Sequence, residues 1–587
     1  MNTERIVMGN LMGNSSGKDL ELGQILDPVT KAYENTLWVG MRLSAEKGIT
    51  NLVALKQALR VVVARANPAD QIELIRNFRK VAEQAISCLV PLTGAEESDE
   101  GLAKLQAFQK AYEEKFGWPF LIFSEGPRHR GLSFLKFLGA LEARIQNPMP
   151  IERQESLLHL HRIAEYRLSL HFERAPDWGY KIWDGCEALS QLSEEPNSLT
   201  VTFLSAAHQA VSAQLKQMFL DAGFDEVGID AIGNVVGRYH GAKEAQSPYL
   251  LTGSHYDTVR NGGAFDGRVG IVLPMEFVRK LSSERQRLPF GIELVAFSEE
   301  EGVRFPATFL GSSALVGDFQ SDWLSLVDTN GVSLQSALSK GGLAACLRDI
   351  QTLRRDPKNY LGFVEVHIEQ GPVLYKCGLP LGVVTAINGS RRYKLKLVGQ
   401  ASHAGTTPMN DRRDVACAAA EIILFVEKAA GQGSSTVATV GVLQVSNGSI
   451  NTVPGQCELS LDVRAPEDDD RDFLVEAIFA EISAICKRRQ VSFESREVLK
   501  IAAAPCDLKL RELWAGAIQD LGLKVFELPS GAGHDAMKMH QTMPQAMLFV
   551  RGENNGVSHN PLESTDSDDL QLAFEAFERF CLRLGCQ

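Results

Sequence analysis

The chain has 587 residues, a formal net charge of −13 and 44% hydrophobic residues. At about 100–200 residues per domain, this length predicts about three or four domains. The composition is that of a globular protein rather than a disordered one. The acidic balance argues against nucleic acid or an anionic membrane as a partner, because both bind basic surfaces.

The cellular location is predicted from apolar runs and cysteines. No apolar run reaches the roughly 18–20 residues needed to span a bilayer, and the N-terminal residues lack the pattern of a secretory signal. The ten cysteines are scattered and form no C-x-x-C pair. Neither a disulfide framework nor a thiolate zinc site is therefore expected, and we predict a cytoplasmic protein without a membrane partner.

The first part of the chain, 1–175, has the pattern of helices. Apolar residues recur at three- and four-residue spacing in the segments 101–116, 132–145 and 155–172. Pro176 then ends any helix, and its neighbours are typical of a linker. We therefore expect an all-α N-terminal domain.

Strands and helices alternate in the next part of the chain. A predicted helix over roughly 203–222 is followed by short apolar strands at 248–253 and 291–297, each ending in a glycine-rich or acidic turn. This alternation predicts βαβ units and a mainly parallel sheet with active residues at the strand ends. We expect this α/β domain to span 176–383 and to resume over 498–587.

A third pattern occupies 384–497. The segments YKLKLVG, TVATVGVLQV and CELSLDVRA alternate polar and apolar residues with period two, as strands of a half-solvated antiparallel sheet do. DVACAAAEIILFVEKAA, which lies between them, has the pattern of an amphipathic helix. The predicted fold is therefore multidomain: an all-α domain, then an α/β domain into which a small α+β domain is inserted.

A histidine and two aspartates follow the first apolar strand of the α/β domain. The strand in LLTGSHYDTVRNGGAFDG ends at His255, and Asp257 lies two residues further on. Residues i and i+2 of an extended chain point the same way, so Asp257 can hold the second ring nitrogen of His255, as partners of metal-bound histidines do. Asp266 follows in a glycine-rich loop that can fold back on the site. The alternative interpretation is a capped turn with a surface histidine.

Three consecutive glutamates, 299–301, follow the second apolar strand. Adjacent carboxylates repel one another, so this placement is costly unless a cation or a proton neutralises them. One carboxylate that binds a metal, beside one that transfers protons, would explain the run. A solvated acidic turn is the alternative.

Two further segments add imidazoles to this set. EVHIEQGP contains His367 and Gln370, and SHNPLE contains His559 just before the C-terminal helix. The chain thus offers three imidazoles and two carboxylates: His255, Asp266, Glu301, His367 and His559. Such a set suits two divalent ions, zinc or manganese, that share one carboxylate.

Nine motifs resemble those of the allantoate amidohydrolases and N-carbamoyl-amino-acid hydrolases, which belong to the two-metal peptidase and amidohydrolase superfamily. They are GSHYDTV, GGAFDG, EEEGVRF, HIEQGP, SHAGTTPM, INTVPG, DVRAPE, GAGHDA and SHNPLE, spread over roughly 185–587. The resemblance implies that His255 and His367 bind one metal, that Glu301 and His559 bind the other, and that Asp266 bridges both.

The resemblance also implies catalytic and substrate-binding roles. Glu300 would be the general base, and Asp257 would support His255. Substrate contacts would come from Gln370, His403, Asn451, Arg464, Gly533 and the adjacent His534. Arg464 would hold the substrate carboxylate in a planar fork that lysine lacks. The small domain would be both lid and homodimer interface, and His403 would reach the partner subunit's site to stabilise the oxyanion.

The helical domain resembles 2-oxo-4-hydroxy-4-carboxy-5-ureidoimidazoline decarboxylase, an all-helical enzyme of urate breakdown. The segments YENTLWVG, GAEESDEGL and YEEKFGWPFLIF carry this resemblance. Glu96 matches the family's acidic residue, but Phe78 stands at its catalytic histidine and Glu125 at its substrate-binding arginine. We therefore expect a degenerate domain with a structural or partner-binding role.

Several functions are compatible with these motifs. An allantoate amidohydrolase, which releases ammonia and carbon dioxide, is favoured because the fused domain also belongs to ureide breakdown. An N-carbamoyl-L-amino-acid hydrolase would use the same ligands and Arg464, and a bifunctional enzyme would retain decarboxylase activity. A non-catalytic scaffold is disfavoured, since it has no need of five metal ligands beside Glu300.

Overall fold

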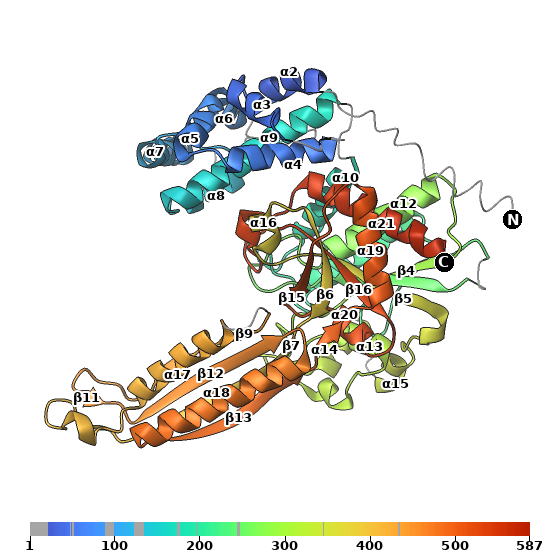
Figure 1. Cartoon of the computed structure of the whole chain (residues 1–587). Helices are drawn as coiled ribbons and strands as arrows, with labels where there is room; N and C mark the ends of the chain where they lie inside the picture. Colours follow the sequence, from blue (N-terminus) through green and yellow to red (C-terminus); the bar gives the residue numbers. More distant parts are fainter. Residues whose placement is uncertain are drawn as a thin grey trace.

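The structure is a computed structural model. It describes residues 22–46, 49, 52–87, 99–122, 134–172, 177–195, 198–243, 247–343, 346–431 and 435–586. Figure 1 shows a helical domain, an α/β domain and an elongated small domain that extends away from the α/β domain. No helix among the described residues is long and apolar enough to cross a membrane.

The helical domain packs around a core of its own, which includes the fully buried Trp118, Tyr112 and Phe78. Its helices are α2 (Leu22–Ala32), α3 (Leu37–Leu43), α4 (Leu52–Ala64), α5 (Pro68–Asn77), α6 (Arg79–Ser87), α7 (Asp99–Phe116), α8 (Phe134–Arg144) and α9 (Met149–His171). Every element assigned in this part of the described chain is a helix, which confirms the prediction of an all-α domain.

A nine-stranded sheet forms the centre of the α/β domain. Its strands are β1 (Glu226–Ile229), β2 (Val235–Tyr239), β3 (Tyr249–His255), β4 (Gly291–Phe297), β5 (Tyr360–Ile368), β6 (Leu381–Ile387), β14 (Ala504–Pro505), β15 (Glu527–Ser530) and β16 (Gln545–Val550). The order is β1-β2-β4-β3-β5-β16-β6-β14, and β15 also pairs with β6. Strands β4, β3, β5 and β16 run parallel, so their carboxyl ends meet at one edge.

The prediction of a mainly parallel sheet is correct for the centre and wrong for the edges. Strand β2 is antiparallel to both β1 and β4, and β6 is antiparallel to β16 and β14. Parallel neighbours need a crossover of about a dozen residues or more, whereas only a short turn joins β1 to β2. Apolar periodicity carries no information on strand direction, so the sequence pattern missed these reversals.

Helices pack on this sheet and on one another. They are α10 (Asp177–Ser190), α11 (Ala206–Ala222), α12 (Val269–Ser283), α13 (Leu310–Val316), α14 (Leu334–Lys340), α15 (Leu347–Gln351), α16 (Val373–Cys377), α19 (Leu508–Asp520), α20 (Ala536–Met539) and α21 (Ser567–Gly585). Helix α12 packs on the three parallel strands β3, β4 and β5, directly after the loop that contains Asp266.

The small domain contains a five-stranded antiparallel sheet with two long helices. The sheet strands are β7 (Gly389–Val398), β9 (Val437–Thr439), β10 (Leu443–Val445), β12 (Gln456–Ala465) and β13 (Ser492–Ile501), and the helices are α17 (Val415–Ala430) and α18 (Asp468–Arg489). A separate pair, β8 (Ser402–His403) and β11 (Thr452–Val453), lies at the end away from the α/β domain (Figure 1). The inserted α+β domain is thus confirmed.

The boundaries of the small domain differ from the predicted 384–497. Position 384 lies within β6, which belongs to the large sheet, and position 497 lies within β13. The small sheet therefore spans 389–501. Only Asn388 separates β6 from β7, so the change of sheet occurs without a connecting loop.

Candidate metal centre

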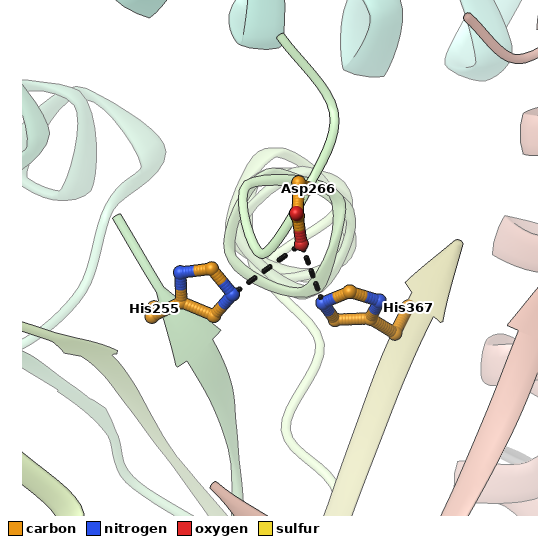
Figure 2. A group of neighbouring side chains, drawn as sticks. All are labelled: His255, Asp266 and His367. Carbon is orange, nitrogen blue, oxygen red and sulfur yellow. Dashed lines mark ion pairs between the residues drawn. The ribbon is translucent and has the colours of Figure 1, made fainter. Parts of the chain in front are cut away.

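One carboxylate oxygen of Asp266 faces two histidines at the parallel edge of the sheet. Asp266 Oδ1 lies 3.5 Å from His255 Nε2 and 3.3 Å from His367 Nε2. Figure 2 shows the histidines reaching from β3 and β5 towards Asp266, which lies on the loop before α12. All three side chains are buried, and their ligand atoms are close enough to hold one ion.

The other oxygen of Asp266 faces a second group. Asp266 Oδ2 lies 3.2 Å from His559 Nε2, which lies 3.7 Å from Glu301 Oε1. These three residues also have the spacing of a metal site. The structure thus brings together all five predicted ligands in two groups that share Asp266. The side chain of His559 is 50% exposed, so solvent reaches the centre on this side.

The residues present fit a pair of divalent ions. Asp266 Oδ1 is buried and accepts no hydrogen bond from the described residues, which is costly unless a cation neutralises it. The hydrogen bond to Asp266 raises the pKa of His559 to about 9. Burial alone would lower the pKa of His255, but the neighbouring carboxylates of Asp257 and Asp266 raise it. Divalent ions would displace the protons that these imidazoles carry.

A further carboxylate, Glu563, positions Asp266, the residue common to both groups. Glu563 Oε1 accepts hydrogen bonds from the backbone N–H groups of Phe265 (2.9 Å) and Asp266 (3.0 Å). Its other oxygen accepts a 2.6 Å hydrogen bond from Ser558 Oγ. Sequence reasoning did not assign this role to Glu563, because a contact with a loop so distant in the chain has no local pattern.

Asp257 positions both a predicted ligand and the acidic turn. His255 Nδ1 donates to the Asp257 carbonyl oxygen at 3.1 Å and lies 3.4 Å from the Asp257 carboxylate. That carboxylate accepts hydrogen bonds from the backbone N–H groups of Glu300 (3.1 Å) and Glu301 (3.2 Å). The predicted support of His255 is therefore only part of what Asp257 does.

Glu299 and Glu300 are buried and the side chain of Glu301 is only 8% exposed, so the alternative of a solvated acidic turn is wrong. Glu299 is fully buried and accepts a 2.6 Å hydrogen bond from the backbone N–H of Gly302. Glu300 and Glu301 instead face His255. Burial, followed by the charge of Glu301, raises the pKa of Glu300 well above its usual range. Burial and Asp266 raise the pKa of Glu301 to about 7.

Three of the predicted substrate-binding residues lie at this centre. Gln370 Nε2 donates a 2.9 Å hydrogen bond to Asp266 Oδ2 and lies 3.3 Å from His559 Nε2. The ring of the buried His534 lies 4.5 Å from that of His367. A Cβ atom on Gly533 would lie 3.8 Å from Glu300 Oε1 and only 3.0 Å from Phe309 Cζ, so a side chain at this position would crowd the surroundings of that carboxylate.

Arg464 lies where the small domain meets the α/β domain. Its Nη1 donates a 2.7 Å hydrogen bond to the carbonyl oxygen of Gly531, two residues before Gly533. Its Nε and Nη2 donate to the two oxygens of Asp462 at 3.1 and 3.0 Å. One edge of the guanidinium is therefore paired within the small domain, while the other faces the loop beside the centre.

The last two predicted contacts do not join the centre of the same chain. His403 ends β8, and Asn451 directly precedes β11, which pairs with β8. This strand pair lies at the far end of the small domain (Figure 1). Both residues are exposed.

The predicted site of the helical domain is only partly described. Phe78 is fully buried in the apolar core of the helical domain. Nη1 of the adjacent Arg79 lies 3.1 Å from Glu113 Oε2, and both of these side chains are exposed. Glu96 and Glu125 lie outside the described residues.

We expect the full-length protein not to decarboxylate the ureidoimidazoline substrate above background, because Phe78 stands where the resemblance implies an acid/base histidine. The measurement is formation of the chiral product in a coupled urate assay, followed by circular dichroism. An active single-domain decarboxylase serves as the positive control. Clear acceleration by this chain would contradict the expected degeneracy.

Comparison with known proteins defines the class of enzyme. Residues 251–583 match the Peptidase family M20/M25/M40, and residues 19–169 match OHCU decarboxylase. The chain belongs to the M20/M25/M40 family and is a hydrolase that acts on C–N bonds. The two resemblances read from the sequence motifs are thereby confirmed.

Two kinds of named hydrolase are similar to this chain. An N-carbamoyl-L-amino acid amidohydrolase of Geobacillus stearothermophilus is 35% identical over 68% of this chain and 96% of its own length. An allantoate deiminase of Arabidopsis thaliana is 35% identical over 67% of this chain and 80% of its own length. A hydantoinase/carbamoylase family amidase from Burkholderia multivorans superposes with a TM-score of 0.65 at 27% identity, covering 70% of this chain and 98% of that one. The structure of AtUAH with glyoxylate gives a TM-score of 0.59 at 30% identity over the same shares.

Proposed function

We propose that the protein is a cytoplasmic allantoate amidohydrolase, which cleaves the ureido group of allantoate and releases ammonia and carbon dioxide in purine catabolism. The observation that carries this proposal is the pair of ligand groups sharing Asp266, with Glu300 directly beside them. The relatives named allantoate deiminase support this substrate. The fused OHCU decarboxylase domain supports it too, because both activities belong to ureide breakdown.

Two divalent ions, zinc or manganese, would occupy the centre. His255 and His367 would hold one ion, and Glu301 and His559 would hold the other. Asp266 would contribute to both sites. When bound, such ions polarise the ureido carbonyl and make hydroxide available near neutral pH.

Glu300 would be the general base of this reaction. Its carboxylate accepts the proton of the attacking water and later delivers it to the leaving nitrogen. Asp257 fixes the backbone of Glu300, and the burial of Glu300 makes it a stronger proton acceptor than an exposed glutamate. Gln370, Gly533 and His534 would contact the bound substrate around this point.

Arg464 would bind the substrate carboxylate as the small domain closes like a lid. Substitution to alanine is expected to lower kcat/KM by roughly a hundredfold or more, since a shielded guanidinium–carboxylate pair is worth about 2–5 kcal/mol. Arg464→Lys should restore little, because an ammonium lacks the planar fork. Metal content should not change, because the ligand groups lie in the α/β domain.

A neighbouring arginine provides the control for Arg464. Arg392 also pairs with Asp462, at 2.9 Å, but its side chain belongs to β7 and is 46% exposed. Arg392→Ala should therefore leave kcat/KM close to that of the wild type. Unchanged efficiency in both Arg464 variants would remove Arg464 from the substrate site and, with it, the main reason for an α-carboxylate substrate.

A homodimer formed through the small domain would complete the site. His403 and Asn451 lie far from the centre of their own chain, so they would serve the partner subunit, with His403 stabilising the oxyanion. Exposed apolar side chains of the small domain supply a surface for such a contact: Val437, Val442, Leu443 and Ile450.

An N-carbamoyl-L-amino-acid hydrolase is the second candidate, because 96% of the length of a relative with that name matches this chain. Both substrates carry a carboxylate near the ureido group and would use the same residues. The test is ammonia release by the metal-reconstituted protein from allantoate and from N-carbamoyl-L-amino acids, measured side by side. A higher kcat/KM for allantoate supports the proposal, and the reverse order assigns the second function.

A further inference from the structure

Six charged side chains are largely buried where the helical domain meets the α/β domain, each at most 18% exposed. The cations belong to the helical domain and the carboxylates to the C-terminal part: Lys56, Arg60 and Arg162, and Glu553, Asp566 and Asp568. Figure 1 shows α4 and α9, which carry the cations, on the side of the helical domain that faces α10 and α21.

Arg162 of α9 binds both ends of one loop. Its Nη2 lies 2.6 Å from Glu553 Oε2 and donates a 3.0 Å hydrogen bond to the carbonyl oxygen of Thr565. Its Nε lies 3.4 Å from Asp566 Oδ2. The segment 553–566, here named the His559 loop, is therefore held at its start and at its end by one guanidinium of the helical domain.

The His559 loop supplies three side chains to the metal centre. His559 is one of the ligands grouped with Asp266 and Glu301. Ser558 and Glu563 hold the backbone and carboxylate around Asp266. Any shift of this loop would therefore move a ligand and the support of the shared carboxylate together.

The backbone of this loop needs external support. Asn554, Asn555 and His559 adopt left-handed conformations with φ of 52°, 61° and 54°. Residues other than glycine persist in this region only when the surrounding structure holds them. On one side, Gly556 packs so closely on the Gly371 backbone that no side chain would fit. On the other side, the helical domain closes the loop.

Charge makes the same contact necessary. Glu553 and Asp566 are buried carboxylates, and such groups are costly without a cation. Burial alone would raise the pKa of Asp566, but Arg162 and Arg60 lower it to about 2. Removal of these two arginines would leave the like charges at the two ends of the His559 loop less compensated, with Arg551 still acting on both.

We propose that the helical domain acts as a positioning domain for the metal centre: Arg162 holds the His559 loop closed and thereby sets the affinity for the ion at Asp266, Glu301 and His559. The inference rests on the proposed ligand set. It gives the decarboxylase-like domain a role in hydrolysis that needs none of the decarboxylase's own chemistry.

The test is a Zn²⁺ titration of the metal-stripped full-length protein against a chromophoric chelator. Arg162→Met is expected to weaken the zinc site at Asp266, Glu301 and His559 by about 10–100-fold, as loss of a ligand's support commonly does. The site at His255 and His367 should weaken less, because it shares only Asp266 with the loop. A His559→Ala variant identifies the affected site. Amide hydrogen exchange within 553–566 should become faster in Arg162→Met.

The matched control is Arg167→Met. Arg167 lies on the same helix and pairs with Glu34 at 2.6 Å within the helical domain, away from the His559 loop. The Arg167→Met variant should bind zinc at both sites with the wild-type affinities. An equal loss in Arg167→Met would show general destabilisation and would overturn the proposal.

Wild-type zinc affinities and unchanged exchange in a folded Arg162→Met protein would also overturn it. If that variant does not fold, Arg162→Lys is scored in the same way, because lysine keeps the charge but cannot reach both loop ends. The zinc titration contains no substrate, so its result does not depend on the hydrolytic activity. A wild-type protein that hydrolyses neither ureido compound would therefore refute the proposed function while leaving this result interpretable.

Discussion

Glu300→Gln is expected to keep both metal ions and to lower kcat by at least about a hundredfold. The amide matches the carboxylate in shape but cannot accept the proton of water, and a positioned general base contributes roughly 10²–10⁴-fold. Glu300 faces His255 and is not needed to complete either of the two groups that share Asp266. Steady-state kinetics together with metal analysis by mass spectrometry measure both quantities.

The adjacent Glu299 is the matched control for this variant. Glu299 is also buried but is turned to the N–H of Gly302, and glutamine retains an oxygen that can accept that hydrogen bond. Glu299→Gln should therefore affect stability more than kcat. Near wild-type turnover of Glu300→Gln with its ions bound would show that another group is the base.

Asp266→Asn is expected to lose both ions and, with them, essentially all activity. One carboxylate serves both groups through its two oxygens, and an amide offers no negative charge to either ion. His559→Ala should lose only one ion, because the buried His255, His367 and Asp266 remain. Metal content after dialysis against a weak chelator measures the difference.

Retention of two ions in Asp266→Asn would contradict a shared carboxylate. Retention of one would show that Asp266 belongs to a single group. The fold of each variant is checked by thermal unfolding, because removing the charge of a buried carboxylate also changes its interactions with three imidazoles.

Three of the five candidate ligands, His255, Glu301 and His367, could be predicted because they lie in or just after a strand of the large sheet. His255 and His367 belong to parallel strands, and the carboxyl ends of such strands meet at one edge. Glu301 follows the neighbouring parallel strand β4. Short apolar strands and their terminal residues are local features, so one sequence was sufficient to find them.

Other features depend on contacts that no local pattern records. Glu563 positions a backbone 297 residues earlier in the chain, and Arg162 binds a carbonyl group 403 residues later. The reversed strands at the sheet edges and the change of sheet at Asn388 likewise follow from tertiary pairing. The helical domain could be identified from its helices, but its contact with the His559 loop could not.

The most direct test of the two-metal centre is anomalous diffraction from crystals of the full-length protein grown with zinc or manganese. We expect two peaks roughly 3.5–4 Å apart. One should lie beside His255 and His367, the other beside Glu301 and His559, with Asp266 between them. A single peak, or peaks away from Asp266, would contradict the account.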